Sequence, residues 1–427
     1  MSRIFYLVSA LLLLTYGTAV AQIKFKRYIE TGILLDEYTS SSDVRYCMDG
    51  YTIYTLVPRK VPKEKDIVEM AVYLYATNLH SGQTVKTELD MSECPDEEIK
   101  AFTVAAGKIY LLNYQYKACS CNLTSANKVL KPVKTSALKP SQQVLKLGNH
   151  LLMYSYYPYV PLDQKYLGFA AQLMNAGTAI AGKTSQTKVP GIIMGMYQTP
   201  KVAVSNNRMY VLNSLLGMVD VYNASLQRVG SFTVPLSTLV YNKRIIAFSD
   251  SMYRDAEDKL AVVRGRKPTE EMIDRVMDGP NLFGGNGTGF LSEKIFKSGK
   301  VQLAESILAS PGKLFIIKTW PGDFFKNMRL VDVYDIQKGV IVKSNLFIAP
   351  PATIRSWDDV YQRWAADLKD YVFLTDNTIL SPVKVPQDLD LHFPISQEEL
   401  TRQQNQYIKK EWGGKQPWNY VVSEITY

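Results

Sequence analysis

Polar and aromatic side chains that could bind a ligand stand directly after short apolar runs of this chain, or in the loops beyond those runs. They are Asn113, Tyr114, Tyr156, Asn213, Asp250, Tyr253, Trp320, Asp323 and Asp376. Flat rings can stack on a sugar or a peptide, while amides and carboxylates fix its orientation. If the apolar runs are equivalent strands, these residues share one face of the fold and form a candidate binding face. The alternative is that loop ends are polar in most proteins and that tyrosine, with 28 copies, is simply common in this chain.

The carboxylates in this set also allow an enzymatic interpretation. Asp250, Asp323, Asp376 or a tyrosine could act as general acid and base on a polysaccharide, which requires two such groups about 5–10 Å apart. The sequence has no G-x-S-x-G nucleophile elbow and no H-E-x-x-H zinc motif. Of its three histidines, His80 and His150 fall in predicted turns. We therefore favour a binding protein over a hydrolase or lyase.

Motifs for a phosphate or a metal ion do not fit. Residues 284–289 read GGNGTG, but Phe290 stands where a phosphate-binding loop has lysine, and no strand is predicted before this segment. Asp388 and Asp390 have the opening spacing of a calcium loop without its later glycine and glutamate. We predict no cofactor and no metal ion.

Four cysteines are present, Cys47, Cys94, Cys119 and Cys121. Disulfides form outside the cytoplasm, and the spacing of Cys119 and Cys121 is too tight for an ordinary zinc site. We predict a structural disulfide from Cys94 to either Cys119 or Cys121. Four free thiols are the alternative.

The N-terminus has the three-part layout of a secretory signal peptide. Arg3 precedes an apolar run over residues 4–14, and Ala19-Val20-Ala21 forms a small-residue cleavage site before Gln22. The run is about half of the ~20 residues that a membrane span needs, so a membrane anchor is less favoured. No cysteine follows the cleavage site, which argues against a lipoprotein. We expect cleavage after Ala21 and a mature chain in the periplasm or outside the cell.

The charge of the chain excludes some partners. Its 49 basic and 40 acidic residues give a formal net charge of +9, and the basic residues are scattered in short groups such as Arg59, Lys60, Lys63 and Lys65. No basic stripe is interleaved with aromatics, so nucleic-acid binding is not predicted. These groups are most simply explained as solvated surface. Weak attraction to acidic glycans or to an anionic membrane is the alternative, and it would give a peripheral association with the envelope.

A recurring pattern, a polar turn followed by four apolar residues, predicts the elements that position these side chains. Six copies begin at Ile109, Leu151, Met209, Ile245, Leu314 and Tyr371, and a looser copy begins at Ile53. The mean interval of 53 residues suits a four-stranded blade, which takes about 40–50 residues. We predict an all-β propeller with seven blades by count. Six is the alternative if the looser copy does not form its own blade. A solenoid has shorter repeats of about 20–30 residues, and sandwich strands would not repeat this pattern.

Helices and insertions are expected around this repeat. Insertions are predicted near residues 163–190, which are rich in Ala and Gly, and near 254–300, which include a short helix at 270–277. Helical spacing behind Ser356, a good N-cap, predicts a helix beginning near Trp357.

The end of the chain is predicted to combine a helix with a closing strand. Ser396 and Glu399 form a capping box that opens a helix near 397–411, and the alternating tail 420–427 could close the ring with a strand. The expected organisation is a signal peptide over 1–21, a propeller over 22–395, and a C-terminal helix and closing tail over 396–427.

One blade carries a resemblance. Residues 206–234 contain NNRMYVLN, VDVYN and VGSFTV in succession. Together with the secretory signal, this resembles the extracytoplasmic β-propeller proteins common in Bacteroidetes, which have loosely NHL- or YVTN-like repeats. The resemblance covers most of residues 45–390 and implies fold and location, but no functional residue. We predict a binding or scaffold protein that recognises a protein or glycan partner through one face of the disc. The alternative is a propeller-type polysaccharide hydrolase or lyase that uses loop carboxylates.

Overall fold

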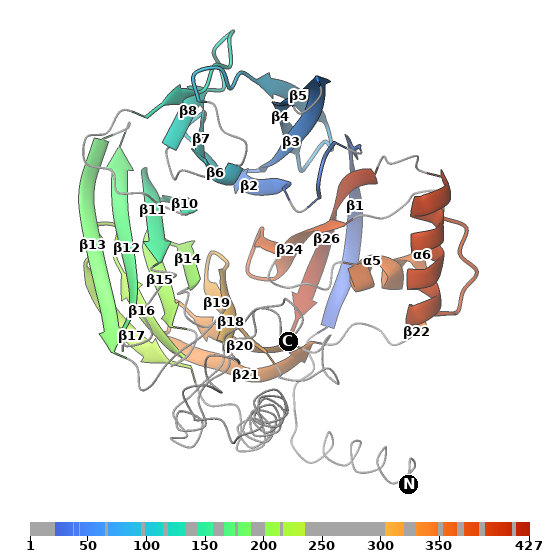
Figure 1. The fold of residues 1–427 in the computed structure, drawn as a ribbon. Coiled ribbons are helices and arrows are strands. Elements are labelled where there is room, and N and C mark those ends of the chain that lie inside the picture. Colours follow the sequence, from blue (N-terminus) through green and yellow to red (C-terminus); the bar gives the residue numbers. More distant parts are fainter. Residues whose placement is uncertain are drawn as a thin grey trace, which may run out of the picture.

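The computed structural model describes most of residues 22–427. The described residues are 22–36, 38–41, 43–64, 67–94, 99–113, 118–133, 143–156, 166–175, 178–188, 201–213, 217–234, 304–319, 329–348, 353–364, 371–383, 389–411 and 416–427. They form six four-stranded antiparallel sheets and one two-stranded sheet. The six larger sheets stand in a ring as the blades of a β-propeller (Figure 1).

Five blades are built from consecutive strands, which run in sequence order from the axis outwards. Blade I contains β2 (Arg45–Asp49), β3 (Thr52–Glu64), β4 (Ile67–Asn78) and β5 (Thr84–Leu89), and blade II contains β6 (Ile99–Ala105), β7 (Lys108–Asn113), β8 (Ala118–Asn122) and β9 (Lys131–Pro132). Blade III contains β10 (Gln143–Leu147), β11 (His150–Tyr156), β12 (Tyr166–Asn175) and β13 (Thr178–Lys188). Blade IV contains β14 (Lys201–Ser205), β15 (Arg208–Asn213), β16 (Met218–Tyr222) and β17 (Arg228–Thr233), and blade V contains β18 (Ala304–Ala309), β19 (Lys313–Thr319), β20 (Arg329–Asp335) and β21 (Val340–Ile348).

Blade VI closes the ring with strands from both ends of the chain. From the axis outwards it contains β23 (Val372–Phe373), β24 (Thr378–Val383), β26 (Gln416–Thr426) and β1 (Gln22–Leu35). The last strand thus pairs with the first, and Gln22 lies opposite Thr426 in their ladder. The closing strand expected in the tail is present, and it begins earlier, at Gln416.

Six hydrophobic clusters, one at each contact between neighbouring blades, form the core. On β3, for example, Leu56 packs with Val104 of blade II, whereas Ile53 packs with Leu380 and Tyr420 of blade VI. Side chains alternate between the two faces of a strand, so a blade between two neighbours needs apolar residues on both faces. At the four other contacts between neighbouring blades, apolar residues from both blades likewise pack together. This requirement explains why the second strand of a blade reads as a continuous apolar run.

The propeller prediction is confirmed, and the blade number is six, the alternative count. Copies of the repeated pattern at Ile53, Ile109, Leu151, Met209 and Leu314 fall in the second strands of blades I to V. The looser copy therefore does form a blade of its own. The copy at Ile245 lies outside the described residues, and β18 packs directly against β14. Blades IV and V are consequently neighbours in the ring, and no seventh blade separates them.

Two other sequence predictions differ from the structure. The pattern at Tyr371 introduces β23, which is a first strand and not a second one. Residues 166–188 are not an insertion but the third and fourth strands of blade III. Ala and Gly have low β-propensity, so nothing in their composition indicated strands. The insertion expected at 254–300, with its helix at 270–277, lies outside the described residues.

The two faces of the disc differ in their connections. We call turn face the side on which first strands connect to second strands and third strands to fourth. Connections there are short, and the longest covers residues 123–130. We call loop face the opposite side. It carries every connection longer than that one between the described strands, including 133–142, 189–200, 234–303 and 349–371.

A small helical lobe lies outside β1 (Figure 1). It is formed by two segments: β22 (Thr353–Ile354) with α5 (Trp357–Trp364), in the connection from blade V to blade VI, and β25 (Ile395–Ser396) with α6 (Gln397–Glu411), between β24 and β26 of blade VI. β22 pairs with β25, and α5 packs against β1, the outermost strand of its blade. The lobe thereby covers a strand edge that would otherwise be open to pairing with another chain.

Both helices start as the sequence predicts. The Ser356 hydroxyl accepts a hydrogen bond from the Asp359 backbone NH at 3.3 Å, and the Ser396 hydroxyl accepts one from the Glu399 NH at 3.2 Å. These bonds satisfy NH groups that have no partner within the helix.

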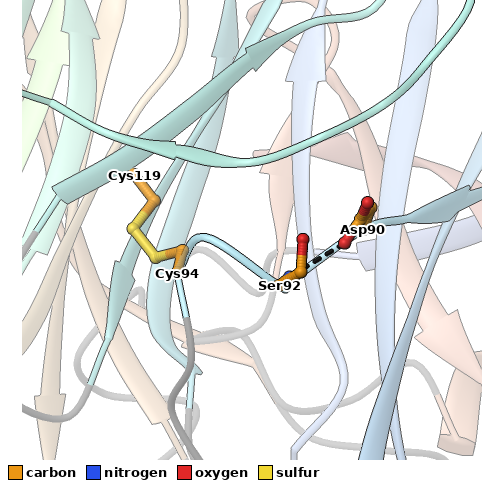
Figure 2. Close-up of a disulfide and its surroundings, with 4 residues drawn as sticks. All are labelled: Asp90, Ser92, Cys94 and Cys119. Carbon is orange, nitrogen blue, oxygen red and sulfur yellow. Dashed lines mark hydrogen bonds between the residues drawn. A yellow bond between two sulfur atoms is a disulfide. The ribbon is translucent and has the colours of Figure 1, made fainter.

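A disulfide joins Cys94 to Cys119, one of the two partners expected for Cys94 (Figure 2). Cys94 lies in the connection from blade I to blade II, and Cys119 lies in β8. A tight turn precedes Cys94, in which the Ser92 NH donates to Asp90 Oδ1 at 2.8 Å. The bond therefore ties the crossing between two blades to the third strand of the second one.

Candidate functional site

The loop face collects part of the predicted binding face. Asn113 and Asn213 end β7 and β15, the second strands of blades II and IV, and are only 5% and 8% exposed. Tyr156 ends β11 at the same level of blade III. Tyr114, Asp250, Tyr253, Trp320 and Asp323 lie outside the described residues. Three of the nine residues are thus placed at the ends of equivalent strands.

Asp376 lies on the turn face, away from Asn113 and Asn213. It follows β23, a first strand, and successive strands of a blade run in opposite directions. Its Oδ1 accepts hydrogen bonds from the Ser310 hydroxyl at 2.7 Å and from the Gly312 NH at 2.6 Å. These bonds join the inner turns of blades V and VI, so Asp376 connects two blades.

Cations at the loop face were not predicted. Arg45 and Lys201 begin β2 and β14, and Lys100 is the second residue of β6, where the pairing with β7 shifts register between Ile99 and Ala101. First strands of neighbouring blades contact one another around the axis, so these partly exposed residues lie near the axis on the loop face. A β-bulge re-aims its side chain and is common near functional sites. The repeated pattern contains no signal for these cations, because it marks the second strand and not the first.

The inner turns on the opposite side are joined by polar contacts. Lys146 of blade III forms an ion pair with Asp49 of blade I at 2.7 Å, although blade II lies between them in the ring. The Ser205 hydroxyl of blade IV donates to the Ser310 carbonyl of blade V at 2.7 Å. These contacts hold the inner turns together. The loop face differs from this side, because it carries the long connections between the described strands together with the cations Arg45, Lys100 and Lys201.

The described free thiols are poor candidates for chemistry. Burial, assisted by the Asp49 carboxylate, raises the pKa of the Cys47 thiol to about 12. Burial also raises the pKa of Cys121, while nearby Lys128 opposes this shift. A thiol acts as nucleophile or metal ligand only as the thiolate, so both remain inert at neutral pH.

Metal binding and membrane crossing have no support in the part of the chain that the structure describes. No group of three or more His, Cys, Asp or Glu side chains in that part could hold a metal ion. None of its helices has the length and apolar character needed to cross a membrane.

The Asp376 contact gives a prediction for stability. A Cβ at Gly312 would lie under 3.0 Å from Asp376 Oδ2, so the Asp376 carboxylate would have to move and its hydrogen bonds to Ser310 and Gly312 would weaken. We expect Gly312→Ala to lower the free energy of unfolding by about 1–3 kcal/mol. Asp376→Ala should cost about 1–3 kcal/mol through its lost hydrogen bonds. The double variant should cost less than the sum, because the clash disappears with the carboxylate. Urea unfolding of the wild type, the two single variants and the double variant measures these free energies. Strictly additive losses would contradict the contact between Gly312 and Asp376.

Comparison with known proteins shows only distant similarity. No family model matches the sequence, and no curated protein is significantly similar to it. A protein of Bacteroides fragilis NCTC 9343, provisionally described as exported, matches over 95% of this chain and 96% of its own, with 9% identity and a TM-score of 0.47. A chain of the COPII outer coat vertex on membranes matches over 81% of this chain and 73% of its own, with 8% identity and a TM-score of 0.35. The computationally designed Ika8 protein matches over 82% and 96%, with 8% identity and a TM-score of 0.32. These similarities are too weak to indicate an activity, a partner or a location.

Proposed function

We propose that this protein is an exported binding or scaffold propeller that recognises a protein or glycan partner through its loop face. The observation that carries the proposal is the difference between the two faces. Connections on the turn face are short, whereas the loop face carries all the long ones. Binding residues are found disproportionately on loops that a rigid scaffold positions. A closed ring of six blades is such a scaffold.

The side chains at the loop face suit recognition. Asn113 and Asn213 are buried and would support the loops that follow them, whereas Arg45, Lys100 and Lys201 are partly exposed and supply positive charge. Amides donate and accept hydrogen bonds, and cations bind carboxylate or sulfate groups of a protein or glycan. Tyr114 and Trp320 directly follow β7 and β19, and Asp250 belongs to the connection between blades IV and V, which leaves and re-enters the ring at this face. They would add stacking and a further acceptor.

Export is supported by the disulfide between Cys94 and Cys119. Disulfides persist in oxidising compartments and are rare in the cytoplasm. The signal-peptide pattern of residues 1–21 supports the same location. We place the mature protein in the periplasm or outside the cell, with a peripheral position at the envelope as one arrangement.

The polysaccharide hydrolase or lyase is the second candidate. It requires two carboxylates about 5–10 Å apart at one mouth of the ring. Asp376 is engaged by Ser310 and Gly312 on the turn face, which removes it from any pair of carboxylates at the loop face. We therefore rank binding above catalysis.

Replacement of Trp320 and Asp250 by alanine together tests the proposal. We expect the mature wild-type protein to retain a partner in a pull-down from envelope and secreted material, or on a glycan array. The double variant should lose that partner and keep the wild-type unfolding midpoint. Val229→Ala, on the exposed outer strand of blade IV, is the matched control and should bind normally.

Two outcomes would contradict the proposal. Undiminished capture by the double variant would exclude this face as the site. Release of new reducing ends or unsaturated products from a polysaccharide panel, lost in Asp250→Asn, would establish the enzyme in its place.

A further inference from the structure

A two-stranded arm projects from the loop face at blade I. β3 pairs with β2 only as far as Leu56, and β4 pairs with β5 only as far as Val72. Beyond these residues β3 and β4 continue to pair with each other alone, and we call this extension, residues 58–64 with 67–71, the arm. It is about 20 Å long, since a strand rises about 3.3 Å per residue. Two strands by themselves are marginally stable in water, so a third strand would stabilise the arm.

We propose that the outer edge of β4 in this arm, at Val68 and Met70, binds an extended segment of a partner protein as an added strand. The proposal rests on the proposed function, because the arm projects from the loop face. It deepens that function by assigning the partner to the class of proteins and the contact to a backbone ladder.

Two hydrogen bonds fix the direction of the backbone groups in the arm. The Lys60 NH donates to the Tyr38 carbonyl at 2.9 Å, so the backbone groups of Lys60 face away from β4. The residue opposite Lys60 is Met70, and in an antiparallel ladder the two residues of such a pair both face outwards. Further along β4, the Asn78 NH donates to the residue before β5 at 2.9 Å, so even-numbered residues of β4 face the side of β5. The NH and carbonyl groups of Val68 and Met70 therefore point out of the arm on that side.

The other edge of the arm, on β3, is closed to further pairing. Its outward-facing residues are Pro58, Lys60 and Pro62, which stand opposite the outward-facing residues of β4. Proline has no NH, and the Lys60 NH already has a partner. Natural sheets use proline on an edge to prevent pairing with other chains, and residues 67–71 contain none. Among the described residues, no strand lies beside this part of β4, so its edge is the open one.

The base of the arm is fixed before a partner binds. Arg59 Nε donates to Asp36 Oδ2 at 2.7 Å, and the guanidinium carbon lies 5.4 Å from the centre of the Tyr38 ring. With the backbone bond of Lys60, these contacts tie the arm to the connection between β1 and β2. A partner strand would not have to order this base, so less binding free energy is lost.

The outward groups match a polypeptide backbone. Val68 and Met70 offer two donors and two acceptors at the spacing of a strand ladder, which an extended chain can satisfy in line with β5. A second copy of this chain fits poorly, because the register that uses both residues places Glu69 opposite itself, and like charges directly opposite destabilise a strand pair. The same glutamate favours a basic residue in a partner. The class expected is therefore an extended segment with a basic residue between two apolar ones.

Fluorescence anisotropy with a labelled peptide tests the site on the mature protein. The probe is the fluorescein-labelled, amidated pentapeptide TVKVT, whose valines would stand opposite Val68 and Met70 and whose lysine would stand opposite Glu69. We expect wild type to bind it. The same peptide with methyl groups on both valine nitrogens should bind at least about tenfold more weakly, because these nitrogens no longer donate. TVEVT should also bind more weakly, because its glutamate would meet Glu69.

Two variants separate the backbone contact from other effects. Val68→Pro removes one outward NH and leaves the bonds between β3 and β4 in place, as Pro62 does on the opposite strand. We expect it to bind TVKVT at least about tenfold more weakly than wild type. Val68→Thr keeps the NH, is the matched control and should bind within about threefold of wild type. Both variants should keep the wild-type unfolding midpoint.

Amide hydrogen exchange of the free protein, followed by NMR, measures whether the edge is open. The NH groups of Val68 and Met70 should exchange fast, and those of Glu69 and Ala71 slowly, because the odd-numbered residues bond to β3. Addition of TVKVT should slow exchange at Val68 and Met70.

Four results would overturn the site: no binding of TVKVT, equal binding of the N-methylated peptide, unchanged binding by Val68→Pro, or slow exchange at Val68 and Met70 in the free protein. The last would mean that a segment of this chain covers the edge. Self-association of wild type that is lost in Val68→Pro would make a second copy the occupant instead.

Failure of the arm and failure of the loop-face site are distinguishable. If TVKVT does not bind but the Trp320 and Asp250 double variant loses its partner, the arm is excluded and the loop-face proposal stands. If the double variant captures its partner normally while Val68→Pro loses both that partner and TVKVT, the arm stands and the Trp320 and Asp250 site is excluded.

Discussion

A chain that stops at Gly414 should fail to form the closed propeller. It lacks β26, the strand that links the inner half of blade VI to β1. Deletion removes buried Trp418, Tyr420, Val421, Val422 and Ile425 from the interfaces of blade VI with blades V and I. Each such side chain contributes about 1.5–3 kcal/mol when buried. The total, about 10 kcal/mol, is comparable to the whole stability of a folded domain, about 5–15 kcal/mol.

The expected result is loss of cooperative unfolding. Urea titration of the truncated protein, followed by tryptophan fluorescence, should show no sigmoidal transition. A peptide with the sequence of residues 416–427, added in trans, should restore one. A control peptide with Val421→Ser and Val422→Ser should not, because these neighbours face opposite blade interfaces. A truncated protein with the wild-type midpoint would show that closure does not depend on this strand.

Removal of the disulfide should cause the next largest loss. Cys94 and Cys119 are 25 residues apart in sequence, and closing a loop of that length stabilises the folded state by about 3 kcal/mol. We expect the Cys94→Ala/Cys119→Ala variant to unfold with a free energy lower by about that amount. Reducing agent should destabilise the wild-type protein similarly and leave the double variant unaffected.

Cys121→Ala is the matched control. Cys121 lies on the same strand and in the same hydrophobic cluster, but its thiol is free. Its replacement should cost about 1 kcal/mol, as for a small buried group, and the variant should stay sensitive to reducing agent. If reductant does not change the unfolding midpoint of the wild-type protein, the disulfide makes no contribution to stability.

The sequence predicts the repeat, but it does not show which strand of a blade the repeated pattern marks. Second strands are buried on both faces, so β15 reads as Met209–Leu212 without interruption. First strands such as β2 are half-buried and begin or end with charges, in this case Arg45 and Asp49. Outer strands such as β17 are mostly exposed and have no apolar pattern. The blade boundary therefore had no local signal, and the predicted blades began one strand late.

Whether the repeated pattern marks a first or a second strand decides on which face of the disc a candidate residue lies. For Asn113 and Asn213 the repeated pattern marks second strands, so their placement on the loop face follows from the sequence. For Asp376 the same pattern marks a first strand, and the residue falls on the turn face. The contact between Tyr51 and His80 could not be predicted, because the sequence of one turn does not show which other turn lies beside it in space. Contacts between blades, such as Lys146 with Asp49, are equally inaccessible without the ring.

The pairing of Gln22 with Thr426 means that the ring has no structural starting point. The first and last strands lie on one ladder, so in a chain that begins at Gln22 a linker of a few residues could join its ends, and the chain could be opened instead at a long connection. Such circular permutants would keep the cyclic order of the sheets and every interface between them. What defines this fold is thus the order of its sheets around the axis, and the position of the chain ends is incidental.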